Sequence, residues 1–167
     1  SLAPSCRFMC SSEDRVWFGG LWDPRVIQAS RTIIPGEPLQ CATSNAFKVL
    51  LPDACTGLAY QDGTTVGFCK RSIYLVTGDG PNNQGQGLWS SPRALTKNLG
   101  CINYLSILET SEGILFQSER GIYLIPRGFG APVFVGAGVQ ETVKAYPTCL
   151  GAAVHSGASI LAIIGLT

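Results

Sequence analysis

One layout recurs along the chain every 48 to 50 residues, and this repeat constrains the fold more than any other feature. Each copy combines apolar residues, a short polar turn and a strand-like run that ends in phenylalanine. The phenylalanines Phe18, Phe68 and Phe116 are 50 and 48 residues apart, and the tripeptide Ile-Tyr-Leu recurs 49 residues apart, at Ile73 and Ile122. Because several anchors agree on one period, we take the repeat as genuine.

The repeat unit is predicted to consist of β-strands. Short runs of β-branched and aromatic residues flank small polar turns, and Gly or Pro interrupts nearly every window long enough for an amphipathic helix. A fainter fourth copy begins at Gly151 and places Ile164 48 residues beyond Phe116. The predicted hairpin turns are 11–14, 61–63, 111–113 and 156–157.

A period near 48 residues, with about four strands per unit, is typical of a β-propeller blade. We therefore predict an all-β fold in which residues 1–167 form a single, incomplete β-propeller of about three and a half blades. Known propellers close with about four to eight blades, so this chain is expected to be a fragment or to be completed by another polypeptide. The predicted blades are 5–50, 51–100, 101–143 and a partial blade, 144–167.

The composition indicates a globular domain with extensive protein contacts. Only 14% of the residues are charged, 46% are hydrophobic, and the formal net charge is +1, which argues against both disorder and a strongly basic nucleic-acid surface. No membrane span is expected, because the longest apolar run, SILAIIGLT, is shorter than the roughly 20 residues that a spanning helix needs. Eight arginines against four lysines fit interfaces, and Trp17, Trp22 and Trp89 suit a core or an interface equally.

Seven cysteines are an odd number, so at least one lies outside any intrachain disulfide. Cys6 and Cys10 on one strand would be about 13 Å apart, beyond the roughly 7 Å that a disulfide spans. We expect reduced, mostly buried thiols, with a structural disulfide or a zinc site as alternatives. The seven are Cys6, Cys10, Cys41, Cys55, Cys69, Cys101 and Cys149.

The glycine-rich segment 76–92 is the most distinctive stretch of the chain. It lacks the Lys-Ser/Thr of a phosphate-binding loop and the acidic ligand that closes a calcium loop, so no metal or cofactor is predicted. It is either a long ordered connection anchored by a tryptophan or an interaction loop, with a metal site as the remaining alternative. The predicted interaction residues are Gly78, Asp79, Asn82, Asn83, Gln84 and Trp89 in this segment, and Ile160, Ile163 and Ile164 in the final strand.

No catalytic residue is predicted, and the chain is expected not to be an enzyme. His155 is the only histidine and has no carboxylate close in sequence to orient it, so an exposed turn histidine is expected. Glu109, Glu112 and Glu119 cluster around one hairpin, where the first two are expected to be solvated turn residues. A glycosidase pair stays open, because the fold can bring distant carboxylates together.

An ordered series of short sequence segments resembles segments of propeller-bearing virion proteins of tailed bacteriophages, in particular tail tube or nozzle proteins. These segments are DRVWFGG followed by Ser30-Arg31, then SIYLVTGDGP, Gly100-Cys101 and GILFQSERGIYLIPRG, and the resemblance covers roughly residues 7–155. It implies a non-enzymatic structural component of the tail or neck, located in the virion after synthesis in the host cytoplasm. It also implies a homo-oligomeric ring that contacts other tail and neck proteins and lets DNA pass without sequence-specific binding. Such proteins are several times longer, so this chain corresponds to one piece.

A second function from a different class also fits the repeats. A carbohydrate-binding or carbohydrate-hydrolysing propeller, such as a receptor-binding tip, would carry a wet central pocket lined by carboxylates and aromatic rings. Trp17, Trp22 and Glu109 are the residues that hint at it.

Overall fold

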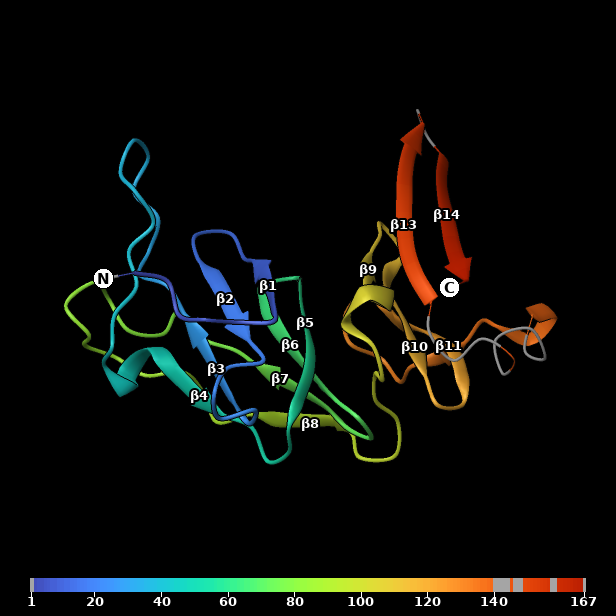
Figure 1. Ribbon diagram of the computed structural model, residues 1–167, viewed down its shortest axis with the longest axis horizontal. Helices are drawn as coiled ribbons and strands as arrows, with labels where there is room; N and C mark the ends of the chain where they lie inside the picture. Colours follow the sequence, from blue (N-terminus) through green and yellow to red (C-terminus); the bar gives the residue numbers. More distant parts are fainter. Residues whose placement is uncertain (1, 140–144, 146–148, 157–158, 167) are drawn as a thin grey trace.

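The chain folds into three successive four-stranded antiparallel sheets followed by a two-stranded hairpin (Figure 1). The computed structural model describes residues 2–139, 145, 149–156 and 159–166, with the backbone alone for the last two ranges. Each four-stranded sheet is a meander, because its strands are ordered as they are in the chain. The all-β prediction is therefore confirmed, and residues 2–139 contain no α-helix.

The strands are short and the connections between them vary in length. The first sheet comprises β1 (Phe8–Ser11), β2 (Val16–Gly19), β3 (Val26–Ala29) and β4 (Lys48–Leu50). The second comprises β5 (Cys55–Gln61), β6 (Thr64–Cys69), β7 (Ile73–Val76) and β8 (Arg93–Thr96). The third comprises β9 (Leu108–Glu109), β10 (Gly113–Ser118), β11 (Gly121–Pro126) and β12 (Val133–Phe134). The hairpin comprises β13 (Cys149–Ser156) and β14 (Ser159–Leu166), and the 3-10 turns are η1 (Asn45–Phe47), η2 (Tyr104–Ser106) and η3 (Ala137–Val139).

The predicted polar turns join the first two strands of each sheet. In the second sheet, Asp62 and Gly63 have φ angles of 49° and 73°, which gives the two-residue turn that matches the twist of antiparallel strands. In the first sheet, the N–H of Ser12 donates to the carbonyl of Arg15 at 2.8 Å and closes the β1–β2 turn. Local sequence therefore determines where these hairpins reverse.

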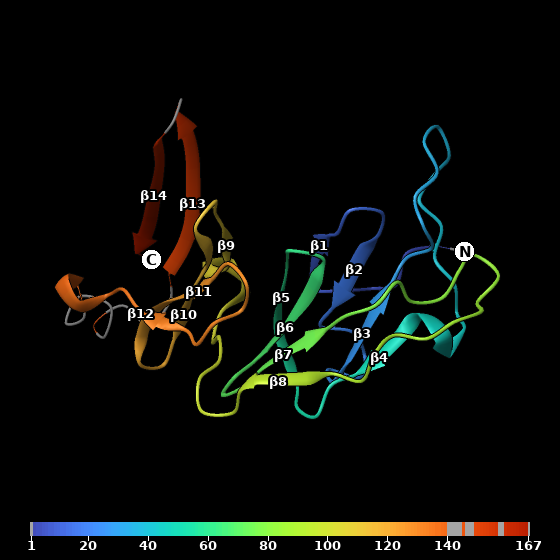
Figure 2. The same cartoon turned by 180° about the vertical axis from the view of Figure 1, so that it is seen from behind.

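The three sheets stack face to face with the second sheet in the middle (Figures 1 and 2). All six residues of β6 are buried, because alternate side chains of this strand are covered by different neighbours. Towards the first sheet, the second sheet presents Leu58, Cys69, Tyr74 and Val76, which pack with Trp17, Ile27, Ala29 and Val49. Towards the third sheet it presents Val66, Phe68, Ile73 and Leu75, which pack with Ile114, Phe116 and Ile125. Burial of such side chains stabilises the stack by about 1.5–3 kcal/mol each.

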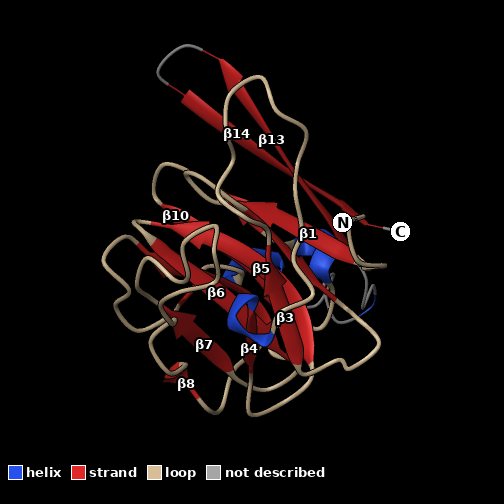
Figure 3. Ribbon diagram, turned by 90° about the vertical axis from the view of Figure 1, so that its left-hand side faces the viewer, coloured by secondary structure: helices blue, strands red, loops and turns tan. Residues whose placement is uncertain are grey.

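The first strands of successive sheets are neighbours. Strand β5 contacts β1 on one side and β9 on the other, and β13 contacts β9. The fourth strands form the opposite edges of the sheets, and in Figure 3 β4, β7 and β8 lie below β1 and β5. The described residues form an open stack that does not close into a ring.

The phenylalanine anchors of the repeat lie on the second strand of each sheet, but they do not share a face. Phe68 and Phe116 face each other, with ring centroids 5.1 Å apart. Trp17 faces the second sheet, so its neighbour Phe18 lies on the other face of the first sheet. The two Ile-Tyr-Leu tripeptides, at Ile73 and Ile122, do occupy corresponding positions, because each begins shortly after the turn that follows the second strand of its sheet. The phenylalanine spacings of 50 and 48 residues each differ by one from the tripeptide spacing of 49, and a shift of one residue along a strand moves a side chain to the other face of the sheet. The structural period is therefore 49 residues.

Candidate functional site

The segment between β7 and β8 closes over the junction of the first and second sheets and is held there by Arg15. This side chain, from the β1–β2 turn, is only 4% exposed. Its Nη1 donates to the Ser30 carbonyl at 3.0 Å, and its Nη2 donates to the Pro81 carbonyl at 2.6 Å. Arg15 therefore joins the loop to the first sheet, a role that no pattern in the sequence indicates.

Trp89 anchors the far end of the same loop. Its ring centroid lies 4.7 Å from that of Trp17, and the Arg15 guanidinium lies 5.3 Å from the centroid of the Trp89 ring. Gly80, with φ +67°, lies directly against the indole, and a Cβ at this position would collide with it. The segment is thus an ordered connection with a tryptophan anchor.

The six residues predicted in this loop fall into two groups. Gly78, Asp79 and Trp89 line a hollow between the sheets, described below. Asn82 and Asn83 are engaged within the chain: the Asn82 side-chain oxygen accepts from the N–H groups of Gln84 and Gln86 at 3.0 and 2.9 Å, and that of Asn83 accepts from the N–H of Thr32 at 2.9 Å. Gln84 is exposed.

The hollow beside Arg15 has a volume of about 300 Å³ and is rich in carboxylates and aromatic rings. Burial lowers the pKa of Arg15, whereas the carboxylates of Asp14 and Asp79 raise it. Burial, and then the carboxylates of Glu13 and Asp14, raise the pKa of Tyr60. The site is therefore polar, with acidic groups arranged around one buried cation.

The outer face of the first sheet carries exposed apolar side chains around a covered centre, where Phe18 is 2% exposed and the Gln28 side chain donates to the Ala42 carbonyl of the β3–β4 connection at 3.0 Å. Trp22 is 101% exposed in the β2–β3 turn, and Leu50 and Met9 are 56% and 62% exposed on β4 and β1. A hollow of about 750 Å³ runs beside Trp22 and is lined in part by Arg7 and Lys48. Among the described residues, no other sheet covers this face, whereas both faces of the second sheet are covered by neighbouring sheets.

A groove of about 500 Å³ runs along the first strands, between β1, β5 and η2. Its walls include Phe8, Leu58 and Tyr104, and Glu109 is the one carboxylate among the described residues that line it. Glu109 is also engaged, because its Oε1 accepts from the N–H of Tyr60 at 2.9 Å. No pair of carboxylates is therefore assembled in this groove by the described residues.

Most of the described cysteines are buried, and at Cys10, Cys55 and Cys69 burial disfavours the reactive thiolate form. Six cysteines belong to no disulfide within the described residues, and four of them, Cys41, Cys55, Cys69 and Cys101, are buried, which agrees with the expectation of mostly buried cysteines. Burial, and then the charge of Glu109, raises the pKa of Cys10 to about 12, and burial raises the pKa of Cys69 to about 11. Among the described residues, no group of three or more His, Cys, Asp or Glu side chains is arranged to hold a metal ion.

The predictions on the final strand concern its backbone alone. Ile160, Ile163 and Ile164 belong to β14, where they pair with His155, Ala152 and Gly151 of β13, and their side chains lie outside what the structure describes. Within the described chain, β14 pairs with β13 only.

The chain has no match among known families. No family model matches it, and no curated protein is similar enough to be matched. In the part of the chain that the structure describes, no helix has the length and apolar character needed to cross a membrane.

Proposed function

We propose that this chain is a non-enzymatic assembly module, a partial β-propeller whose free sheet face is covered by a further β-sheet from another subunit. The supporting observation is the contrast between the second and first sheets. The second sheet is buried on both faces by neighbouring sheets, whereas on the outer face of the first sheet the described residues leave Met9, Leu50 and Trp22 exposed around the β3–β4 connection, and Trp22 lines a hollow of about 750 Å³.

The repeating geometry supports a ring as the form of the assembly. Three meanders stack with their first strands adjacent, and the hairpin β13–β14 continues the row of first strands next to β9. A stack of this kind leaves a face open at each end unless further sheets close it, and propeller blades meet this need by forming a ring. Trp and Arg are among the residue types enriched at interface hot spots, and the exposed Trp22 lines the same hollow as Arg7.

The virion is the setting that the sequence resemblance supports. In that setting the chain belongs to a phage tail or neck, in a homo-oligomeric ring around the DNA channel, with neighbouring tail proteins or a second chain completing the propeller. The low charge of the chain, 14% of residues, agrees with a surface that is largely covered by protein.

The experiment is a substitution on the open face combined with a measurement of assembly. Leu50→Asp places a carboxylate on that face, and sedimentation velocity and electron microscopy measure the oligomers. We expect loss of lateral assembly with an unchanged unfolding midpoint of the monomer, because Leu50 is already 56% exposed. The matched control is Leu105→Asp, since Leu105 is 46% exposed in η2, which contacts β5, β10 and β13, and it should assemble normally. Unchanged assembly of Leu50→Asp contradicts the proposal.

Saccharide binding is the second candidate, and the hollow beside Arg15 favours it. Glu13, Asp14 and Asp79 offer acceptors, and the rings of Tyr60 and Trp89 offer stacking surfaces. Titration with oligosaccharides, followed by tryptophan fluorescence, tests this function. A signal that Asp79→Asn removes would support it, and no signal with any sugar would exclude it.

A further inference from the structure

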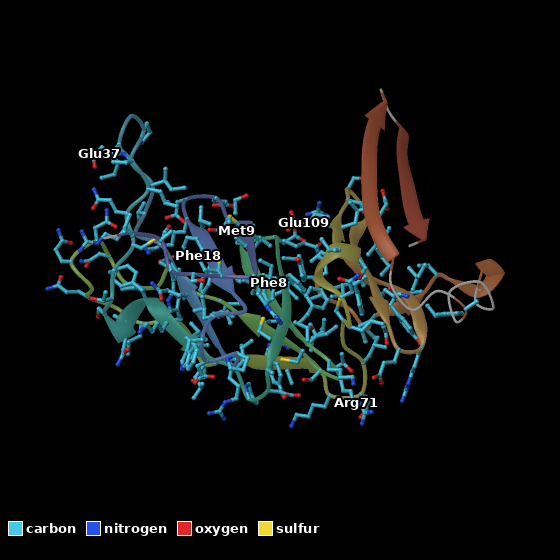
Figure 4. The ribbon with its side chains drawn as sticks, in the orientation of Figure 1. Phe8, Met9, Phe18, Glu37, Arg71 and Glu109 are labelled. Atoms are coloured by element: carbon cyan, nitrogen blue, oxygen red, sulfur yellow. The ribbon has the colours of Figure 1, made fainter. Side chains whose placement is uncertain are left out.

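The fold sorts the charged residues of this nearly neutral chain to two opposite ends. Within each four-stranded meander the odd-numbered strands run towards one end and the even-numbered strands towards the other. The contacts of Arg15 with Pro81 and of Asp62 with Arg127 place the corresponding turns of neighbouring sheets at the same end. We call the end that carries the β1–β2, β5–β6 and β9–β10 turns the acidic end. The opposite end, which carries the β2–β3, β6–β7 and β10–β11 turns, is the basic end. Figure 4 shows Glu37 and Glu109 at the first and Arg71 at the second.

The acidic end carries seven exposed carboxylates against three arginines, a formal net charge of −4 over the described residues. Arg15 is buried beneath the loop, and the Nη1 of Arg127 donates to the Oδ1 of Asp62 at 2.8 Å. Most carboxylates at this end therefore face solvent without a cationic partner. The seven are Glu13, Asp14, Glu37, Asp62, Asp79, Glu109 and Glu112.

The basic end carries six exposed cations against three carboxylates, a formal net charge of +3 over the described residues. Glu119 lies between Lys70 and Arg71, with nitrogen–oxygen distances of 3.4 and 3.5 Å, so one carboxylate serves two cations. The six cations are Arg7, Arg25, Lys70, Arg71, Lys97 and Arg120, and the three carboxylates are Asp23, Asp53 and Glu119.

We infer that the acidic end of one copy docks on the basic end of a second copy. The two ends of the chain complement each other in charge, and opposite potentials steer association and select the partner. A contact between two different surfaces of the same protein is heterologous, so it can repeat and stack copies end to end. The whole-chain charge of +1 conceals this polarity, because the two ends nearly cancel.

The inference extends the proposed assembly function but depends on a different force. Lateral assembly through the first sheet is apolar and persists in salt. End-to-end stacking is electrostatic between exposed charges, so it weakens as the Debye length falls from about 10 Å at 0.1 M salt to about 3 Å at 1 M. A Leu50→Asp variant that no longer assembles laterally should still associate in a salt-dependent manner. The two proposals can therefore fail separately.

Charge reversal at each end provides the test. Glu13→Lys with Glu112→Lys reverses two carboxylates of the acidic end, and Lys97→Glu with Arg120→Glu reverses two cations of the basic end. Sedimentation velocity of the full chain at low salt should show that each variant alone has an association constant about tenfold or more below that of the wild type. An equimolar mixture of the two variants should associate again, since each retains one native end that complements the other.

Lys97→Arg with Arg120→Lys is the matched control, because it changes two side chains of the basic end, both exposed, without changing their charge. This variant should stack like the wild type, and unfolding midpoints of all variants should match. Association that is insensitive to salt, or a mixture that does not associate, overturns the inference. A wild type that shifts a DNA duplex through its basic end but does not self-associate would identify a polyanion as the partner instead.

Discussion

The clamp formed by Arg15 is the contact whose removal has the most localised expected effect. Arg15→Met keeps an unbranched side chain of similar length but leaves the Ser30 and Pro81 carbonyls without their charged donor. Two hydrogen bonds from a charged donor contribute about 3–6 kcal/mol, and relief of the buried charge offsets several kcal/mol of this, so the expected loss is about 2 kcal/mol.

The assay is urea unfolding combined with hydrogen exchange of the loop. Because Arg15 holds residues 77–92 against the first sheet, amides near Pro81 should lose protection even where the protein stays folded. Arg15→Lys, which keeps the charge with a single donor group, should be intermediate. Arg93→Met, at an exposed arginine of β8, should change the unfolding free energy by less than about 0.5 kcal/mol. Unchanged loop protection in Arg15→Met would refute the clamp.

Three further predictions concern packing and pH. Gly80→Ala should destabilise the protein by about 2 kcal/mol, because the new methyl group meets the Trp89 indole at a positive φ, and urea unfolding measures the loss. Phe116→Ala should destabilise by about 3–5 kcal/mol in the same assay, because the ring is 1% exposed between the second and third sheets. Stability should also fall as the pH rises from 9.0 towards about 11, because the folded state holds the proton of Cys69 more tightly than the unfolded chain does. The unfolding midpoint of Cys69→Ala should fall less steeply over this range.

Each of these has its own control. Gly36→Ala shares the positive φ but has nothing within 4 Å of the new methyl group, so equal losses at the two glycines would contradict the indole contact. Phe134→Ala, on the short edge strand β12, should destabilise less than Phe116→Ala, and the reverse order would contradict the assigned core. A slope with pH that is the same in Cys69→Ala and the wild type would place the titration elsewhere.

Local sequence patterns are sufficient to predict the strands and most of the hairpins. Asp62-Gly63 and the turn after Ser11 reverse the chain because of local backbone preferences, which need no tertiary partner. The Ile-Tyr-Leu repeat at Ile73 and Ile122 also marked equivalent strands, because it follows corresponding turns by a fixed number of residues. Trp89 was identified as an anchor from its place in a long polar loop, and its contact with Trp17 fits that interpretation.

The face that each side chain occupies depends on how the sheets pack and could not be predicted from the repeat. Phe18, Phe68 and Phe116 look equivalent in the sequence, yet the face alternates with every residue of a strand, so repeats of 50 and 48 instead of 49 place them on different sides. The role of Arg15 likewise depends on two carbonyls distant from it in the chain. The separation of charge between the two ends has the same origin, because strand direction assigns each turn to an end. The 48-to-50-residue period sets the length of each four-stranded unit, but the stacking of the sheets sets which neighbours the turns and side chains of that unit meet.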